Sequence, residues 1–212
     1  MTASWVPGGA RTRLVLVRHG ATAHSADKRF SGRNDLPLND LGAGQAAALA
    51  RRAASFGAAA AVVSSPLVRT VQTATAIADA LALPLRTVDD LAECDFGEWE
   101  GLTFAEVRAA HGAALAAWTG SPDVAPPGGE SFAAVGARVT RARDAMLTTH
   151  AGTTVVVVTH VTPIKLLVQA ALGAPPAAMF RLFLDTASVS IVDYSGDGGA
   201  TLRLFNDTSH LG

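Results

Sequence analysis

The chain has 212 residues, of which 49% are hydrophobic and 17% are charged, and its formal net charge is -1. This balance is typical of a single globular domain and excludes both a disordered chain and a protein that coats nucleic acid through its overall charge. No run approaches the roughly 18 apolar residues of a membrane span, and the opening residues lack a signal-peptide pattern, so we expect a cytoplasmic protein with no membrane or nucleic-acid partner.

The beginning of the chain has a different composition from the rest. Residues 1–12 combine glycine and proline with polar residues and show no hydrophobic period, which predicts a flexible lead-in or the remnant of a linker. We therefore expect one folded domain over residues 13–212. Three later segments share an aliphatic run, a short turn and a helical stretch, and the runs are 14–17, 60–63 and 155–158. Such runs are typical of parallel strands buried on both faces.

Alanine-rich stretches between these runs predict helices that cover the sheet, at 41–55, 67–82, 131–149 and 163–172. We expect Gly57, Gly152 and Gly173 to end helices, and Ser65 with Pro66 to form the cap and first turn of the second helix. Near the end of the chain, SVSIVDY and ATLRLF flank GDGG, which predicts a hairpin on the sheet edge. The predicted fold class is α/β.

Cationic side chains follow each of the three predicted strands. Arg18 and His19 follow the first, Arg69 lies shortly after the second, and His160 follows the third. A lone histidine is more often a satisfied polar residue than a catalyst, but the carboxyl ends of parallel strands meet at one edge of a sheet, where ligands collect. Four cations gathered there predict an anionic ligand, and phosphate best fits the forked geometry of arginine.

The motifs resemble those of the histidine phosphatase superfamily, the phosphoglycerate mutase-like group. The similarity covers essentially the whole folded part in the family's order, through Leu16 to Thr22, Ser64 to Arg69, Glu93 with Phe96 to Gly101, and Thr159-His160. The resemblance implies a three-layer α/β/α sandwich with a mostly parallel central sheet. It also implies a phosphomonoesterase that acts on a small phosphorylated substrate. We expect no cofactor and no metal, because the clustered cations would repel a divalent ion.

The resemblance assigns a role to each matching residue. His19 is the nucleophile that takes up the phosphoryl group as phosphohistidine. Arg18, Arg69 and His160 form the phosphate pocket, with the amide of Val161 as a further donor. We expect activity to peak below neutrality if His160 works best as a cation and if Glu93, the residue that matches the family's proton donor, must carry a proton.

Glu93 matches the acid that protonates the leaving oxygen and then takes a proton from water. Read without the resemblance, it would be a surface carboxylate, and Glu98 and Glu100 compete for the role but fit a structural turn better. By resemblance, Thr22, Ser31 and Gly32 are also substrate contacts. The sequence departs from the family at two places. Phosphoglycerate mutases have asparagine where Ser25 stands, and many members have glycine where Val161 stands.

Phosphatase, mutase and binding module are the three functions in question. The predicted lid, Ala109 to Ser131, has no Lys or Arg and ends in a Pro-Gly stretch expected to be mobile. This favours a phosphatase, because a mutase needs extra basic residues to hold a doubly phosphorylated intermediate. Lys165 and Arg108 are either basic neighbours of the site or members of solvated helix faces, and we favour the helix faces for both. A phosphate- or phosphoprotein-binding module is less favoured, because it has no use for both His19 and Glu93.

Three further stretches, PPGGESF, VVVVTHVTPIK and LRLFNDTSHL, are similar to the carboxyl-terminal acid phosphatase domain of actinobacterial proteins that fuse it to an RNase HI domain. Those domains in turn resemble α-ribazole phosphatases. The resemblance implies that the full-length protein carries an N-terminal RNase HI domain and that residues 1–12 are the linker remnant. It leaves two alternative functions open, an α-ribazole 5'-phosphate phosphatase and a phosphoglycerate mutase.

Overall fold

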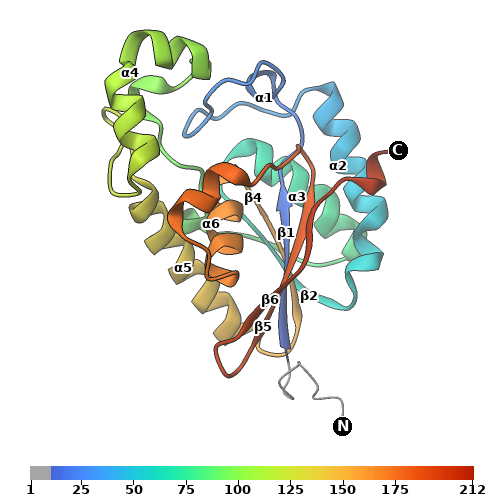
Figure 1. Cartoon of the computed structure of the whole chain (residues 1–212). Helices are drawn as coiled ribbons and strands as arrows, with labels where there is room; N and C mark the ends of the chain where they lie inside the picture. Colours follow the sequence, from blue (N-terminus) through green and yellow to red (C-terminus); the bar gives the residue numbers. More distant parts are fainter. Residues whose placement is uncertain (1–10) are drawn as a thin grey trace.

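The computed structural model describes residues 11–212, so the predicted character of residues 1–10 lies outside the described part. Its centre is a six-stranded sheet in the order β3-β2-β4-β1-β5-β6 (Figure 1). The strands are β1 (Arg11–Arg18), β2 (Ala59–Ser64), β3 (Leu85–Thr87), β4 (Thr154–Thr159), β5 (Val189–Ser195) and β6 (Ala200–Asp207). Each of the three aliphatic runs is therefore the centre of a strand.

The sheet is mostly parallel, as predicted. Strands β3, β2, β4 and β1 are parallel to their neighbours, whereas β5 is antiparallel to β1 and β6 is antiparallel to β5. The predicted hairpin at the end of the chain is confirmed as β5 and β6. Strand β1 begins two residues before the predicted start, because Arg11 and Thr12 pair with Ser195 and Tyr194. These polar residues follow no hydrophobic period, so only the pairing with β5 reveals them as strand.

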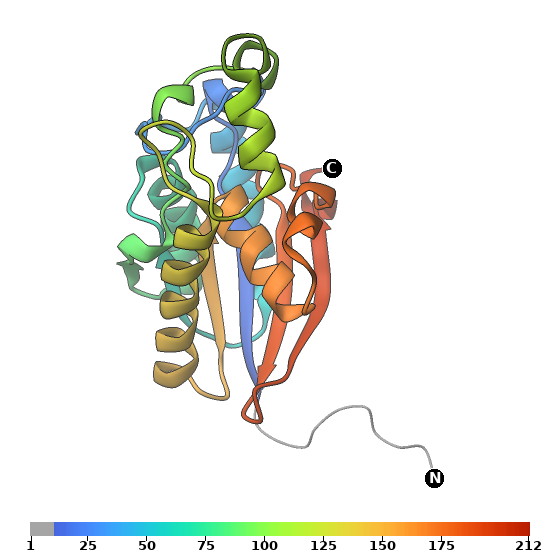
Figure 2. The same cartoon turned by 60° about the vertical axis from the view of Figure 1, so that its left-hand side comes forward.

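Helices cover both faces of the sheet. They are α1 (Ala23–Ala26), α2 (Asp40–Arg52), α3 (Val68–Leu81), α4 (Phe104–Gly120), α5 (Phe132–Thr149) and α6 (Val161–Ala171). Short 3₁₀ helices are η1 (Ala53–Phe56), η2 (Asp89–Leu91), η3 (Gly97–Trp99), η4 (Pro176–Arg181) and η5 (Ser209–Leu211). Helices α2 and α3 lie on one face, and α5 and α6 lie on the other (Figures 1 and 2). The predicted three-layer sandwich is confirmed.

Strand β1 shows how the sequence specifies two cores. Leu14 and Leu16 point into the core under α5 and α6, while Val15 and Val17 point into the core under α2 and α3. All four side chains are fully buried, and each such burial contributes roughly 1.5–3 kcal/mol to folding. Because both faces are apolar, polar groups can gather only at the ends of the strands.

Helix α3 begins differently from the prediction. Its first residue is Val68, and the Val68 amide donates to the Asp35 carboxylate at 2.6 Å. The expectation that Ser65 caps this helix is wrong, because Asp35 arrives from a distant loop and supplies the acceptor. The hydroxyl of Ser65 lies instead 2.8 Å from the ring nitrogen Nε2 of His160.

The predicted lid lies beyond the carboxyl edge of the sheet, where α4 projects past the strands (Figures 1 and 2). The backbone of α4 departs from helical geometry at His111. The Pro-Gly end of the lid is held in place, against expectation. The Glu98 amide donates to the Pro127 carbonyl at 2.9 Å, and the Glu130 amide donates to the Asp95 carbonyl at 2.8 Å. A Cβ on Gly129 would lie 2.5 Å from the Asp95 carbonyl oxygen, so only glycine permits this approach.

Candidate active site

The predicted cations meet at the carboxyl edge of adjacent strands. His19 follows β1 and His160 follows β4, and the His19 amide donates to the Thr159 carbonyl at 3.1 Å. The two imidazole rings stand edge to face with their centroids 5.1 Å apart. A cleft of about 710 Å³ opens here. The predicted site residues that line it are Arg18, His19, Thr22, Ser31, Glu93 and Val161.

The tautomer of His19 follows from one hydrogen bond. Its Nδ1 lies 2.7 Å from the carbonyl oxygen of Gly20, which can only accept, so Nδ1 carries the proton. The lone pair is consequently on Nε2. The N–H of that same peptide group, on Ala21, donates to Oε1 of Gln45 at 2.8 Å and fixes the carbonyl that orients the ring. The preceding peptide is also held, because the Gly20 amide donates to the Thr73 hydroxyl at 3.1 Å. His19 therefore presents an unprotonated nitrogen, the form of histidine that can act as a nucleophile.

The surroundings of both imidazoles favour their neutral form. Burial, followed by the positive charges of Arg18 and Arg69, holds the pKa of His19 well below its ordinary value. Burial and then Arg69 lower the pKa of His160 in the same way, with His19 and Arg18 adding to the effect. Burial and these neighbouring charges favour the neutral ring, so the expectation that His160 acts as a cation stays a prediction. A neutral His160 can still donate, because a Ser65 hydroxyl that donates to Nε2 leaves the proton on Nδ1.

Arg18 and Arg69 are held by neutral acceptors. Arg18 donates to the Leu184 carbonyl at 2.6 Å. Arg69 is fully buried and donates to the carbonyls of Ser31, Gly32 and Asn34, at distances of 2.7–3.1 Å. Because carbonyl oxygens carry no formal charge, both guanidinium groups retain their positive charge for an anionic ligand.

Three nitrogen atoms of this cluster are buried and have no hydrogen-bond partner within residues 11–212. They are Nε of Arg18, Nε of Arg69 and Nδ1 of His160. Unsatisfied buried donors are costly, and their cost is recovered when an acceptor arrives. Burial lowers the pKa of Arg18 to about 10, despite the nearby Glu93 carboxylate, so Arg18 remains charged at neutral pH. The cluster is thus suited to a group with several acceptor oxygens, such as phosphate.

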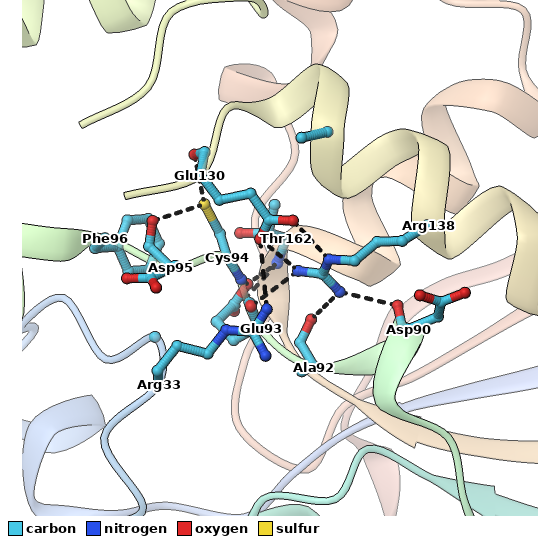
Figure 3. Close-up of polar contacts among 12 residues, drawn as sticks. Arg33, Asp90, Ala92, Glu93, Cys94, Asp95, Phe96, Glu130, Arg138 and Thr162 are labelled. Carbon is cyan, nitrogen blue, oxygen red and sulfur yellow. Dashed lines mark hydrogen bonds and ion pairs between the residues drawn. The ribbon is translucent and has the colours of Figure 1, made fainter. Parts of the chain in front are cut away.

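Glu93 is buried at the cleft and is not a surface carboxylate. Only 4% of the residue is exposed. Its Oε1 accepts the Cys94 amide at 2.7 Å, and both carboxylate oxygens lie 3.3 Å from the Thr162 amide in the first turn of α6 (Figure 3). Glu100, its competitor, accepts from the amides of Gly32 and Arg33 and holds that loop, in line with its interpretation as structural.

The other predicted substrate contacts occupy different places. Thr22 caps α1 and forms a capping box with Ser25, so Ser25 has a structural task here. Ser31 lines the cleft. The Gly32 amide already donates to Glu100, and its carbonyl accepts from Arg69, so Gly32 supports the pocket through its backbone. Val161 is the first residue of α6, whose amino end points at the site.

Sequence reasoning missed several members of the site. Ser65 and Thr73 contact the two histidine-bearing segments, and the signal for them was their place directly after β2 and one turn into α3. Lys165 lines the cleft, so its interpretation as part of a solvated helix face is wrong. Burial, together with the nearby Arg18 charge, lowers the pKa of Lys165 despite the attraction of Glu93. The spacing of Lys165, four residues after Val161 on one helix, would have indicated this.

One side of the cleft is strongly apolar. The residues that form it are Phe30, Phe96, Phe104, Trp118, Phe132, Met179, Phe180 and Phe183. Phe183 is 70% exposed and Phe180 is 47% exposed, which is unusual for such large side chains outside a binding surface. The cleft therefore joins a cationic end to an aromatic wall.

Within residues 11–212, no group of three or more His, Cys, Asp or Glu side chains is arranged to hold a metal ion. Over the same residues, every helix is too short or too polar to cross a bilayer.

Comparisons with known proteins agree with this geometry. The family model described as histidine phosphatase superfamily (branch 1) matches residues 14–208. The bifunctional protein Rv2228c of Mycobacterium tuberculosis is 48% identical over 203 residues, a region that covers 96% of this chain and 56% of that protein. The chain thus spans about half the length of this relative. A probable phosphoglycerate mutase, GpmB of Yersinia enterocolitica, is 34% identical and is covered to 94%, as is this chain.

Solved structures give the same picture. YhfR of Bacillus stearothermophilus superposes with a TM-score of 0.86 at 30% identity, over 95% of this chain and all of that one. The mycobacterial glucosyl-3-phosphoglycerate phosphatase Rv2419c in complex with VO3 superposes with a TM-score of 0.83 at 32% identity, over 92% of this chain and 99% of that one. A putative alpha-ribazole-5'-P phosphatase from Escherichia coli K-12 superposes with a TM-score of 0.81 at 29% identity, over 92% of this chain and 96% of that one.

Proposed function

The chain belongs to the histidine phosphatase superfamily, and from this premise we propose that it is a metal-independent acid phosphatase acting on small phosphomonoesters through His19. The observation that carries the proposal is the His19 tautomer. The Gly20 carbonyl, 2.7 Å from Nδ1, leaves the lone pair on Nε2. A module that only binds phosphate needs the arginines but has no need of an oriented, unprotonated imidazole nitrogen.

In the first chemical step, the Nε2 lone pair of His19 attacks phosphorus and forms an N–P bond as the bond to the leaving oxygen breaks. Glu93 gives its proton to that oxygen, so the product leaves as a neutral alcohol. Arg18, Arg69 and His160 donate to the non-bridging oxygens, where charge must be stabilised during transfer. The buried, unpaired nitrogens of these three residues support this assignment.

In the second step, water attacks the phosphohistidine. Glu93, now ionised, takes a proton from that water as the new P–O bond forms and the N–P bond breaks. Inorganic phosphate leaves and Nε2 recovers its lone pair. The amides of Cys94 and Thr162 hold the Glu93 carboxylate in place for both proton transfers.

The aromatic side of the cleft supports a substrate whose phosphate is attached to a small apolar or ring-bearing group. The GpmB relative favours the alternative of a phosphoglycerate mutase. The lid has no Lys or Arg, which favours hydrolysis, although Lys28 and Lys165 reach the cleft from other segments. The neighbour titled alpha-ribazole-5'-P phosphatase keeps α-ribazole 5'-phosphate as an alternative substrate.

The test is turnover of p-nitrophenyl phosphate between pH 4 and pH 9, with and without EDTA, in the parent protein and in His19→Ala. We expect turnover that is insensitive to EDTA, is fastest below neutrality and is absent from the variant. Quenched reactions should contain an acid-labile, base-stable phosphoryl group on His19. Binding of phosphate without turnover of any phosphomonoester would establish the binding module instead. Interconversion of phosphoglycerates that is faster than phosphate release would establish the mutase.

We further propose that this domain works in the cytoplasm as the carboxyl-terminal part of a longer protein with an N-terminal RNase HI domain. The support is the 56% coverage of a relative whose name calls it bifunctional. Cleavage of RNA in an RNA–DNA hybrid by the full-length gene product, but not by residues 1–212, is the expected result. A full-length product without that cleavage would refute the proposal.

A further inference from the structure

Arg138 is a buried arginine that the phosphoryl-transfer steps do not use. It lies on α5, and only 7% of it is exposed. It shares the buried stripe of that helix with apolar side chains such as Val135 and Val139. A charged side chain in such a stripe needs a reason, because burial of a charge is costly unless every donor finds an acceptor.

All five N–H groups of Arg138 have acceptors (Figure 3). Nε and Nη2 form a forked pair with the Glu130 carboxylate, each at 2.8 Å. The remaining three donors reach main-chain carbonyls, those of Asp90 at 2.9 Å, Ala92 at 2.6 Å and Glu93 at 2.9 Å. Arg138 thus clamps the peptide segment that carries Glu93, including the carbonyl of Glu93 itself.

Glu130 connects this clamp to the lid. Burial alone would raise the pKa of Glu130, but the hydrogen bonds and charge of Arg138 outweigh it and the pKa is lowered. The Glu130 amide donates to the Asp95 carbonyl, and its own carbonyl accepts from the Cys94 thiol at 3.3 Å. The end of the lid and the residues after Glu93 therefore form one hydrogen-bonded unit.

The geometry of this unit bears on proton transfer. A proton donor must lie within hydrogen-bond reach of the leaving oxygen, and a misplacement of about 1 Å is enough to slow a reaction severely. The Glu93 side chain has only a few torsions, so its carboxyl follows the position of its main chain. The segment that includes this main chain accepts three bonds from a single guanidinium group, one of them at the Glu93 carbonyl itself.

We propose that Arg138, charge-balanced by Glu130, is a positioning residue that sets the location of the Glu93 carboxyl for protonation of the leaving oxygen. The inference rests on the proposed role of Glu93. It has a chemical signature that a merely structural ion pair lacks. An alkyl phosphate releases a strongly basic alkoxide and needs the proton, whereas p-nitrophenolate is stable enough to leave without one.

The experiment compares kcat/KM for β-glycerophosphate with kcat/KM for p-nitrophenyl phosphate, because kcat/KM reports the phosphorylation of His19 whichever step limits kcat. The parent protein, Glu93→Gln, Arg138→Lys and Glu130→Gln are measured together. The matched control is Arg141→Ala. Arg141 lies on the same helix and bonds to the Asp90 side chain at 3.0 Å, but 65% of its side chain is exposed.

For Glu93→Gln we expect a loss of about 10²–10⁴-fold on the alkyl substrate and a loss of under about tenfold on the aryl substrate. Arg138→Lys keeps the charge but offers three donors in place of five, so we expect about a tenfold loss confined to the alkyl substrate. Glu130→Gln should show the same pattern more weakly, and Arg141→Ala should match the parent protein on both substrates.

Equal losses on both substrates in Arg138→Lys and Glu130→Gln, or no loss in either, would overturn the positioning role. Circular dichroism and thermal melting identify a variant that fails to fold, and the result then rests on the variant of the pair that folds. The proposed function fails separately. It fails if the parent protein turns over neither substrate, or if Glu93→Gln slows both equally.

Discussion

The neutral, buried pair His19 and His160 predicts that the fold loses stability as the pH falls from 7 to 5. An unfolded histidine, with an ordinary pKa of about 6.5, takes up a proton over this range. The folded protein does not, because burial and the neighbouring arginines hold both pKa values well below that figure. The unfolded state therefore binds more protons, and the free energy of unfolding decreases as the pH decreases.

The size of the effect follows from the same linkage. Each histidine that stays neutral at pH 5 costs about 2 kcal/mol between pH 7 and pH 5, so the pair costs about 4 kcal/mol. This is a large share of the roughly 5–15 kcal/mol by which domains are stable. Carboxylates contribute little in this window. Asp193 and Asp207, whose pKa values are lowered in the fold, stabilise it above pH about 4, and that part is lost only at lower pH.

The assay is urea unfolding at pH 5, 6 and 7 in buffers without phosphate, followed by the fluorescence of the buried Trp99 and Trp118. His19→Gln and His160→Gln should each remove about half of the pH dependence that the pair causes. His150→Gln, which changes the residue after the end of α5, is the control and should leave the dependence unchanged. An equal pH dependence in the parent protein and in the double variant would refute the reasoning.

Three further predictions concern the site. Arg69→Ala should lower kcat/KM for p-nitrophenyl phosphate by about 10²–10³-fold. Arg69→Lys should not restore the rate, because lysine cannot reach three carbonyls and the phosphate together. Full rescue by lysine would contradict this prediction. Ser65→Ala leaves Nε2 of His160 buried without a partner, so it should lower kcat/KM about tenfold and also lower the melting temperature by a few degrees. An unchanged rate would separate Ser65 from the pocket. Phe183→Asp should raise KM for naphthyl phosphate several-fold, since Phe183 lines the apolar side of the cleft, while the inhibition constant of inorganic phosphate stays the same. A parallel change in KM and in the inhibition constant would argue against a contact between Phe183 and the leaving group.

The parts of the fold that local pattern could predict were the buried ones. The aliphatic runs predicted β1, β2 and β4, because a strand with two apolar faces needs no information from elsewhere in the chain. The placement of His19 and His160 at one edge followed from the parallel direction of those strands. The start of β1 at Arg11 was missed, since its polar residues become strand only by pairing with β5.

The supporting contacts of the site could not be predicted, because they join segments far apart in the sequence. The Asp35 carboxylate accepts the first amide of α3, and the 31–34 loop surrounds Arg69. In each case more than thirty positions separate the two partners. Arg138 is a further case. A lone arginine in an apolar helical stripe has no local signal that points to Glu93, forty-five residues earlier. The lid was misjudged for the same reason, since composition alone says nothing of the bonds that Glu130 makes.

One feature joins Arg18, Arg69 and Arg138. Within residues 11–212, all their hydrogen bonds outside the Glu130 pair go to main-chain carbonyls. A carbonyl is present whatever amino acid occupies the position. Mutation can therefore replace the side chains of the surrounding loops, provided that the backbone keeps its path, without dismantling the phosphate pocket. Such an enzyme can evolve toward new substrates by changing the walls of its cleft while the same phosphoryl chemistry is inherited intact.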